Sequence, residues 1–121
     1  MRGYRQKIGT WGEKLAEEYL ISKGYQVLDR NYRTPYGEID IIACKAGVVI
    51  FVEVKTRSTT AFGLPEGGVN YKKQAHLVDS AHYYIQEHPQ LQNGWQVDVI
   101  AVQGKPGDKS TELTHFENAI H

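Results

Sequence analysis

Charged side chains that could bind a metal ion recur at short intervals near the middle of the chain. Glu38 and Asp40 are two residues apart, and so are Glu53 and Lys55. Because side chains alternate across a β-strand, each pair would share one face of a strand. Two carboxylates that come close together can share one cation, and they repel each other without it. The spacing therefore indicates a cation site, if the two strands lie side by side.

The residues around these side chains predict a β-hairpin. Two apolar runs rich in β-branched residues, 39–44 and 48–54, are separated by Lys45-Ala46-Gly47. Each run is short for a helix and a glycine lies between them, so two antiparallel strands are favoured.

The length of the hairpin loop decides which charged residues meet. With a two-residue loop at Ala46-Gly47, Asp40 would lie opposite Glu53, with Cβ atoms about 4.5–5.5 Å apart. A slip of one residue would separate these two acids, and Ala-Gly is not a preferred hairpin sequence, so a longer loop or a bulge stays open. In the same register Glu38 would lie opposite Lys55. A half-exposed strand with an ordinary Glu38–Lys55 ion pair is the alternative interpretation.

Length and composition favour one ordinary globular domain. The chain has 121 residues, of which 40% are apolar and 23% are charged, as is typical of a soluble single-domain protein. No apolar run reaches the roughly 18 residues of a membrane span, and the N-terminus lacks a signal peptide's apolar core, so we expect a cytoplasmic protein with no membrane partner. The net charge is zero, so any binding of nucleic acid would depend on local basic patches.

Helical periodicity predicts two helices. The first would begin at Thr10, which can cap the helix while Glu13 completes a capping box, and would follow a flexible basic arm at residues 1–8. Gly12 lies on its apolar face, where a glycine costs about 1 kcal/mol relative to alanine, so we expect close packing on the sheet. The second helix would run over residues 70–88. Its core-facing stripe would contain Ala75, Val78, Ala81, His82 and Ile85.

The remaining segments predict further strands at residues 25–32, 95–102 and 112–116. In the strand at 95–102, Val97 and Val99 would share one face, while Asp98 would lie on the other as a polar position near the strand's end. The order helix, strand, hairpin, helix, strand predicts a three-layer α/β domain, with a central mixed sheet flanked by helices.

Short motifs in the chain resemble the YraN-like family of bacterial proteins. They are Gly-Glu-Ile-Asp-Ile-Ile-Ala from Gly37, Phe-Val-Glu-Val-Lys-Thr-Arg up to Arg57, and Phe-Gly followed by Pro-Glu at residues 62–66. The resemblance runs from about Gly9 to Ala119, and His115, Asn118 and Ala119 match the family's C-terminal signature without a physical role that we can assign. Asp40 with Glu53-Val54-Lys55 also resembles the PD-(D/E)xK nuclease superfamily, and the YraN-like family is distantly similar to archaeal Holliday junction resolvases.

The resemblance implies a restriction-endonuclease-like fold and a metal-dependent site. Asp40 and Glu53 would bind Mg²⁺ or Mn²⁺, and Lys55 would position or help to deprotonate the attacking water. The backbone carbonyl of Val54 would be a further ligand. Glu13 would complete the site, although its capping role alone could explain its position. Glu38 would orient Lys55.

The same resemblance implies a nucleic-acid substrate, with DNA ahead of RNA, and a homodimer. The absence of zinc-finger spacing favours structure-selective cleavage over reading of a long sequence. Cations in the first turn of a helix oppose its dipole, and a bound phosphate would relieve this conflict. A nucleic-acid-binding module that does not cleave is the alternative. The residues expected to hold the strand are Arg33, Arg57, Lys72, Lys73 and Gln74.

Overall fold

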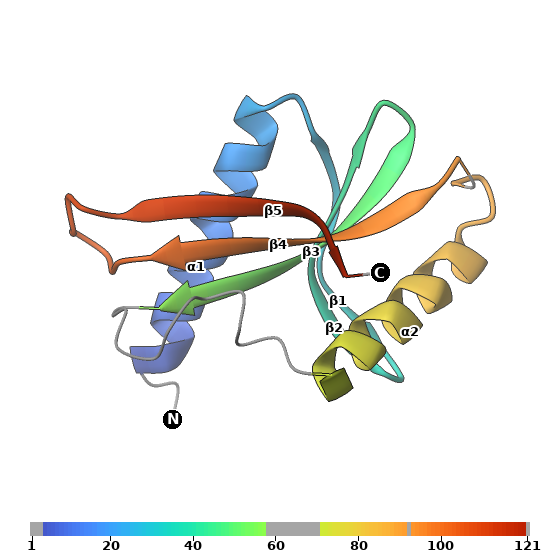
Figure 1. Ribbon diagram of the computed structural model, residues 1–121, viewed down its shortest axis with the longest axis horizontal. Coiled ribbons are helices and arrows are strands. Elements are labelled where there is room, and N and C mark those ends of the chain that lie inside the picture. Colours follow the sequence, from blue (N-terminus) through green and yellow to red (C-terminus); the bar gives the residue numbers. More distant parts are fainter. Residues whose placement is uncertain (1–3, 58–70, 92, 121) are drawn as a thin grey trace.

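The computed structural model describes residues 4–57, 71–91 and 93–120, and confirms the three-layer α/β fold. Two helices pack on a mixed sheet of five strands (Figure 1). The elements are α1 (Tyr4–Ser22), β1 (Gln26–Thr34), β2 (Gly37–Lys45), β3 (Val48–Arg57), α2 (Tyr71–Glu87), β4 (Trp95–Gln103) and β5 (Glu112–Ile120).

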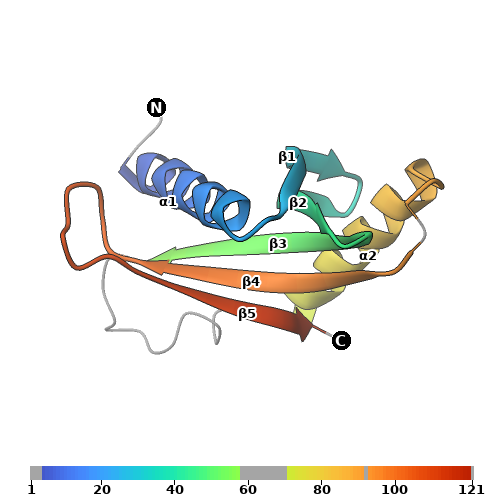
Figure 2. The same ribbon diagram turned by 90° about the horizontal axis from the view of Figure 1, so that it is seen from above.

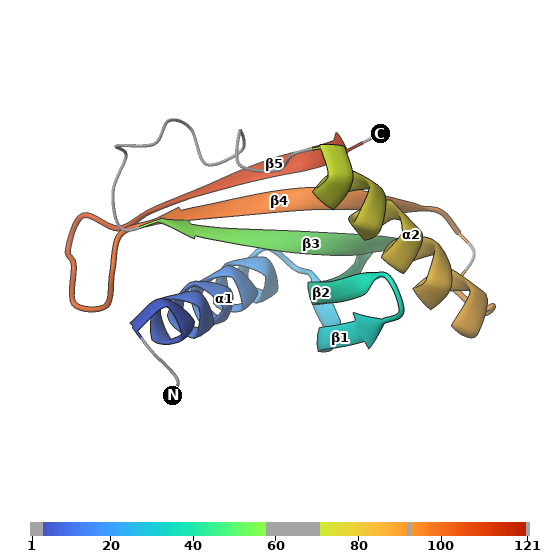
Figure 3. The same ribbon diagram turned by 90° about the horizontal axis from the view of Figure 1, so that it is seen from below.

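The strands follow one another across the sheet in chain order, from β1 to β5. Among the strands of the described segments, β3 and β4 run parallel, and the other neighbouring pairs are antiparallel. Parallel neighbours need a crossover, and α2 lies in that connection. Figures 2 and 3 show the result: α1 and α2 lie on opposite faces, and the β1–β2 hairpin turns away from β3, β4 and β5.

The alternation of side chains along β3 supplies both layers of the core. Val49 and Phe51 face α2, where Leu77, Ala81 and Tyr84 are buried against them. The intervening residues, Ile50 and Val52, face α1 and pack with Ala16 and Leu20. Along β4, Val97 and Val99 lie on the α2 side and Ile100 and Val102 on the α1 side, as the pattern predicted.

The predicted start of the first helix is wrong. The helix α1 begins at Tyr4, so Thr10 is an interior residue and the capping box with Glu13 does not exist. Arg5, Gln6 and Lys7 are good helix formers, so the helix begins before Thr10. Of the predicted arm, residues 4–8 are therefore helical, and residues 1–3 lie outside the described part of the chain.

Gly12 brings α1 close to the sheet, as its position on the apolar face predicted. A Cβ atom at this residue would lie 2.0 Å from the Thr56 hydroxyl oxygen and 3.0 Å from the Thr56 Cβ. Such distances are overlaps, so glycine is required where the helix crosses the end of β3.

The second helix has nearly the predicted bounds but a different buried face. Ala75 and His82 are exposed, whereas Leu77 and Tyr84 are buried with Ala81. The sheet therefore contacts a face rotated from the predicted stripe, because the aromatic Tyr84 and not His82 fills the space above Phe51. Neither described helix has an apolar stretch long enough to cross a membrane.

Candidate active site

The predicted hairpin register is confirmed close to the turn. Pairs from Lys45–Val48 to Ile41–Val52 follow a two-residue loop, and Ala46 and Gly47 both have positive φ angles, of 52° and 81°. This is the geometry of a type I′ turn, whose twist suits a two-residue hairpin.

The strands β2 and β3 separate just beyond Ile41, and Asp40 lies in the fork between them. Ile39 packs on the α2 side whereas Ile41 packs on the α1 side, so the alternation breaks at Asp40. The Asp40 carboxylate oxygen Oδ2 instead accepts a hydrogen bond of 2.9 Å from the Val54 backbone N–H. This carboxylate takes the place of a strand partner for Val54, because β2 no longer provides one.

The fork corrects the predicted cross-strand pairs. The ladder between β2 and β3 ends at Ile41–Val52, so neither Asp40–Glu53 nor Glu38–Lys55 is a ladder pair. The predicted role of Glu38 in orienting Lys55 also lacks a contact, since Glu38 binds Asn31 and Arg33 instead.

Glu53 is a buried acid on the α2 side of β3. Its side chain is only 7% exposed, and Lys73 Nζ lies 2.8 Å from its oxygen Oε1. Lys73, expected to hold phosphate, is therefore an ion-pair partner of an expected metal ligand. Lys55 projects from the same face of β3 and is also buried.

Asn31 joins two further acids to this site. Its φ angle of 48° is unusual within a strand, and asparagine tolerates this left-handed conformation better than most residues. The Asn31 side-chain amide donates to Glu13 Oε1 at 3.1 Å and to Glu38 Oε1 at 3.2 Å. Glu13 thus lies close to Asn31 and lines the same hollow as Asp40. Asn31 was missed, and an asparagine amid strand-forming residues was its only signal.

Burial and mutual repulsion perturb the carboxyl groups of the site. Burial, together with the negative charge of Glu53, raises the pKa of Asp40 to about 8, against the lowering effect of the Val54 N–H. Burial also raises the pKa of Glu13, with smaller contributions from the charges of Glu38 and Glu53, while the Asn31 amide opposes the change. The four carboxyl groups therefore share one electrostatic environment.

The pKa values of Lys55 and Lys73 shift in opposite directions. Burial, with the adjacent ammonium of Lys73, lowers the pKa of Lys55 to about 8. Burial would also lower the pKa of Lys73, but its hydrogen bond to Glu53 and the charge of that residue outweigh this effect and raise it. Lys55 is thus the lysine whose proton is more easily lost.

The acids line two hollows on either side of the fork. Glu13, Asn31 and Asp40 line a hollow of about 160 Å³ beside α1. Glu38 and Glu53 line another, of about 140 Å³, beside α2. The amide of Asn31 reaches Glu38 and so connects the two hollows. Within the described segments, no group of three or more His, Cys, Asp or Glu side chains is already arranged to hold a metal ion.

The remaining residues expected to bind nucleic acid are more scattered. Arg33 is 88% exposed in its side chain and lies 3.5 Å from Glu38. Arg57 is half-buried at the end of β3 and donates to the Thr56 carbonyl at 3.1 Å. Lys72 is exposed and Gln74 is half-buried at the start of α2. These two therefore lie near Lys73, while Arg33 lies near the end of β1.

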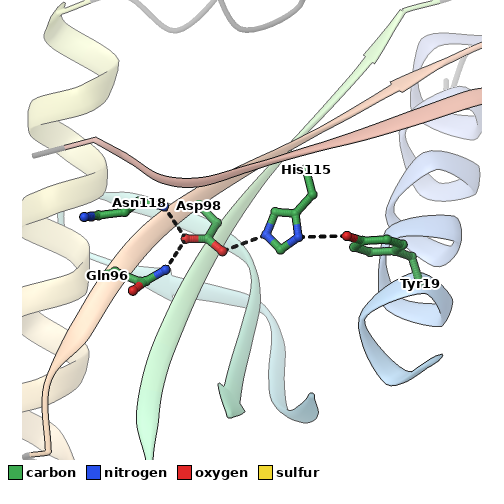
Figure 4. A network of polar contacts seen from close by, with 5 residues as sticks. All are labelled: Tyr19, Gln96, Asp98, His115 and Asn118. Atoms are coloured by element: carbon green, nitrogen blue, oxygen red, sulfur yellow. Dashed lines mark hydrogen bonds and ion pairs between the residues drawn. The ribbon is translucent and has the colours of Figure 1, made fainter. Parts of the chain in front are cut away.

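A second polar cluster, absent from the predicted site, lies on the α1 side of the sheet (Figure 4). Asp98 is fully buried in the middle of β4, so its predicted place near the strand's end is wrong. One carboxylate oxygen lies 2.7 Å from His115 Nε2, and His115 Nδ1 lies 3.1 Å from the Tyr19 hydroxyl. The other accepts bonds of 2.9 Å from the Gln96 amide and the Asn118 backbone N–H.

This cluster gives a physical role to two residues of the C-terminal signature. His115 and Asn118 both bind Asp98, and Asn118 does so with a φ angle of 49° that asparagine tolerates. Together they attach β5 to the interior of the sheet. Burial of Asp98 is possible because hydrogen bonds replace its lost contacts with water.

Comparisons with known proteins agree with the motifs. Residues 12–102 match the model of the Uncharacterised protein family UPF0102. A UPF0102 protein of Alkaliphilus oremlandii is 44% identical over 95% of this chain and 98% of its own. A UPF0102 protein of Thermodesulfovibrio yellowstonii is also 44% identical, over 96% of this chain and 97% of its own.

One solved structure is similar in arrangement but distant in sequence. It is the structure of Pyrococcus furiosus SfsA in complex with Ca²⁺, with 15% identity and a TM-score of 0.39 over 90% of this chain and 62% of that one. The family model and the full-length relatives, in contrast, are matched at the level of sequence. The chain therefore belongs to the UPF0102 family, which is the YraN family that its motifs indicated.

Proposed function

We propose that this protein is a metal-dependent endonuclease that hydrolyses phosphodiester bonds in structured or single-stranded nucleic acid, with DNA ahead of RNA. The observation that carries the proposal is the environment of Asp40. Burial and the charge of Glu53 raise the pKa of this carboxyl group to about 8. A site that crowds acids together in this way is destabilised until a cation or a proton compensates their charge.

The donor atoms at the fork suit Mg²⁺ or Mn²⁺, which prefer carboxylate and carbonyl oxygens. Asp40 and Glu53 would hold the ion, with the Val54 carbonyl and Glu13 as further ligands. When bound, such an ion neutralises charge on a phosphoryl group and makes water more acidic.

Lys55 would position the attacking water or, in its neutral form, accept a proton from it. A general base works best when its pKa lies near the working pH, and the pKa of Lys55 is lowered to about 8. Burial beside Lys73 therefore supports this role, because it brings the pKa of Lys55 closer to the working pH.

The basic residues near the fork would hold the nucleic-acid strand. Lys73, Lys72 and Gln74 begin α2, where the helix dipole favours phosphate, and Arg33 and Arg57 would contact the strand on either side. A homodimer would present two such sites to a branched substrate.

A nucleic-acid-binding module without cleavage is the second candidate. It is favoured by the 2.8 Å ion pair between Lys73 and Glu53, which already compensates one of the carboxylates expected to bind metal. In such a module the lysine would remain on Glu53, and added divalent ions would have no effect.

The test is a cleavage assay with branched, flapped, single-stranded and fully paired DNA and with the matching RNA. Each substrate is incubated in EDTA, Mg²⁺ or Mn²⁺ with the wild type, Asp40→Asn, Lys55→Ala or the control Glu18→Gln. Glu18 is an exposed acid on α1, so its variant should behave as the wild type. We expect metal-dependent cleavage that the first two substitutions abolish while binding persists. Metal-independent binding with no cleavage of any substrate would instead favour the binding module.

A further inference from the structure

Tyr36 is an exposed aromatic residue beside the proposed active site. It lies in the turn between β1 and β2 and is 49% exposed; among the described residues only Ile21 is a similarly exposed large apolar side chain. A single exposed apolar residue is ordinary on a protein surface. Two features distinguish Tyr36 from an ordinary exposed residue: the hydrogen-bonded turn that carries it and the hollow next to it.

The turn that presents Tyr36 is held in place by one hydroxyl group. Thr34 Oγ1 accepts a bond of 3.0 Å from the Tyr36 N–H and donates its proton to the Gly37 carbonyl at 2.9 Å. Because that proton is used, Ser80 must donate in its 2.8 Å contact with Thr34 Oγ1, which attaches the turn to α2. Pro35 restricts the backbone further. These contacts fix the backbone of the turn, from which the exposed Tyr36 side chain projects.

Tyr36 borders the hollow that contains part of the proposed site. Tyr36 and His76 line this hollow together with Glu53 and Lys73. Its volume of about 140 Å³ is well below the roughly 300–1,000 Å³ of sites for drug-sized ligands. Such a space accepts one flat ring more readily than a whole folded ligand, and Lys73 adds an ammonium group to its lining.

We propose that Tyr36 is a stacking platform for one unpaired nucleobase next to the scissile phosphate. The proposal rests on the proposed function and names its substrate class: strands with at least one unstacked base at the site. In a duplex the faces of each base are covered by its neighbours, whereas an unpaired base can place its face on an aromatic side chain. Because every base has such a face, this contact selects structure and not sequence.

The experiment measures binding in EDTA, where cleavage is blocked, by fluorescence anisotropy. The probes are a labelled single strand, the fully paired duplex of the same sequence, and a single strand with 2-aminopurine, whose fluorescence falls on stacking. The variants are Tyr36→Ala, Tyr36→Phe and the exposed control Ile21→Ala. Because the Tyr36 side chain is exposed, thermal melts should confirm that each variant is folded.

We expect Tyr36→Ala to weaken single-strand binding by about 5- to 150-fold, the range for loss of one base–aromatic stack. The preference for single strand over duplex and the quenching of 2-aminopurine should fall with it. Tyr36→Phe should stay within about threefold of the wild type, since phenylalanine keeps the stacking face. Ile21→Ala should match the wild type.

The outcomes separate this proposal from the proposed function. Dependence on Tyr36 without cleavage in Mn²⁺ would support stacking and refute hydrolysis. Metal-dependent cleavage with equal single-strand binding by the wild type and Tyr36→Ala would support hydrolysis and overturn stacking. A wild type that binds none of the probes in EDTA and cleaves no substrate in Mn²⁺ would overturn both.

Discussion

Replacing Asp40 by asparagine should stabilise the metal-free protein while removing a residue essential to the proposed activity. Asparagine can still accept the hydrogen bond from the Val54 N–H, but it cannot ionise beside Glu53. The pKa of Asp40 is raised to about 8, against about 3.9 for an aspartate in an unfolded chain. Ionisation of Asp40 therefore favours the unfolded state.

The magnitude follows from the linkage between protonation and folding. At about 1.36 kcal/mol per pKa unit, a fully expressed shift would cost about 5 kcal/mol at pH 7.5. The Asp40 side chain is partly exposed, and screening by solvent reduces this cost. We therefore expect Asp40→Asn to raise the free energy of unfolding by about 1–3 kcal/mol. For a domain of this size that is about 3–5 °C in melting temperature per kcal/mol.

The sign of the pH dependence is specific to a raised carboxyl pKa. Below about pH 4 Asp40 is protonated in both states, so the wild type and the variant should be equally stable. Between pH 4 and 8 only the unfolded state ionises readily, so the wild type should lose stability relative to the variant. Above pH 8 the difference should remain constant.

The assay is thermal unfolding in EDTA, followed by circular dichroism at closely spaced pH values. Asp79→Asn is the control, because Asp79 is an exposed acid on α2 and its variant should follow the wild type. Asp40→Ala should be less stable than Asp40→Asn, since it leaves the Val54 N–H without its acceptor, at about 1–3 kcal/mol. A lower melting temperature for Asp40→Asn at pH 7.5, or a difference unchanged between pH 4 and 8, would refute the reasoning.

Three further predictions concern the metal, the first helix and the buried polar cluster. Adding Mn²⁺ at pH 7 should release about one proton per site, measurable by calorimetry in buffers of different ionisation enthalpy, because the cation displaces a proton from Asp40; heats that do not depend on the buffer would contradict this. Gly12→Ala should lower stability in urea by about 1–3 kcal/mol despite its better helix propensity, and Thr56→Gly should relieve part of that loss in a double-mutant cycle. His115→Ala should cost about 3–5 kcal/mol by leaving buried Asp98 without its imidazole partner, yet retain the thermal response to Mn²⁺; loss of that response would join the cluster to the site.

Local rules were sufficient for the hairpin and for the faces of β4. Both depend on the alternation of apolar residues, and the two-residue loop at Ala46-Gly47 follows from the length of the gap between two strands. Alternation could not reveal the break at Asp40, because the place where β2 leaves β3 depends on the twist of the whole sheet. The contact of Asp40 with Val54 is a consequence of that break.

Long-range packing explains the other differences from prediction. A strand pattern cannot tell whether Asp98 is buried, since its partner His115 is distant in the sequence. The predicted buried face of α2 is wrong for the same reason. Whether Tyr84 or His82 is buried depends on the contact of Tyr84 with Phe51 of β3, which the helical pattern alone does not show. Asn31 was missed because its two carboxylate partners come from α1 and β2.

The ion pair between Lys73 and Glu53 means that the protein carries its own counter-ion. A divalent cation arriving at Glu53 would compete with this ammonium group and would release it at the start of α2, next to the expected path of a phosphate. The energy lost in breaking the pair would then be recovered in part when the strand binds. Metal and nucleic acid would consequently strengthen each other's affinity by the same factor, as thermodynamic reciprocity requires.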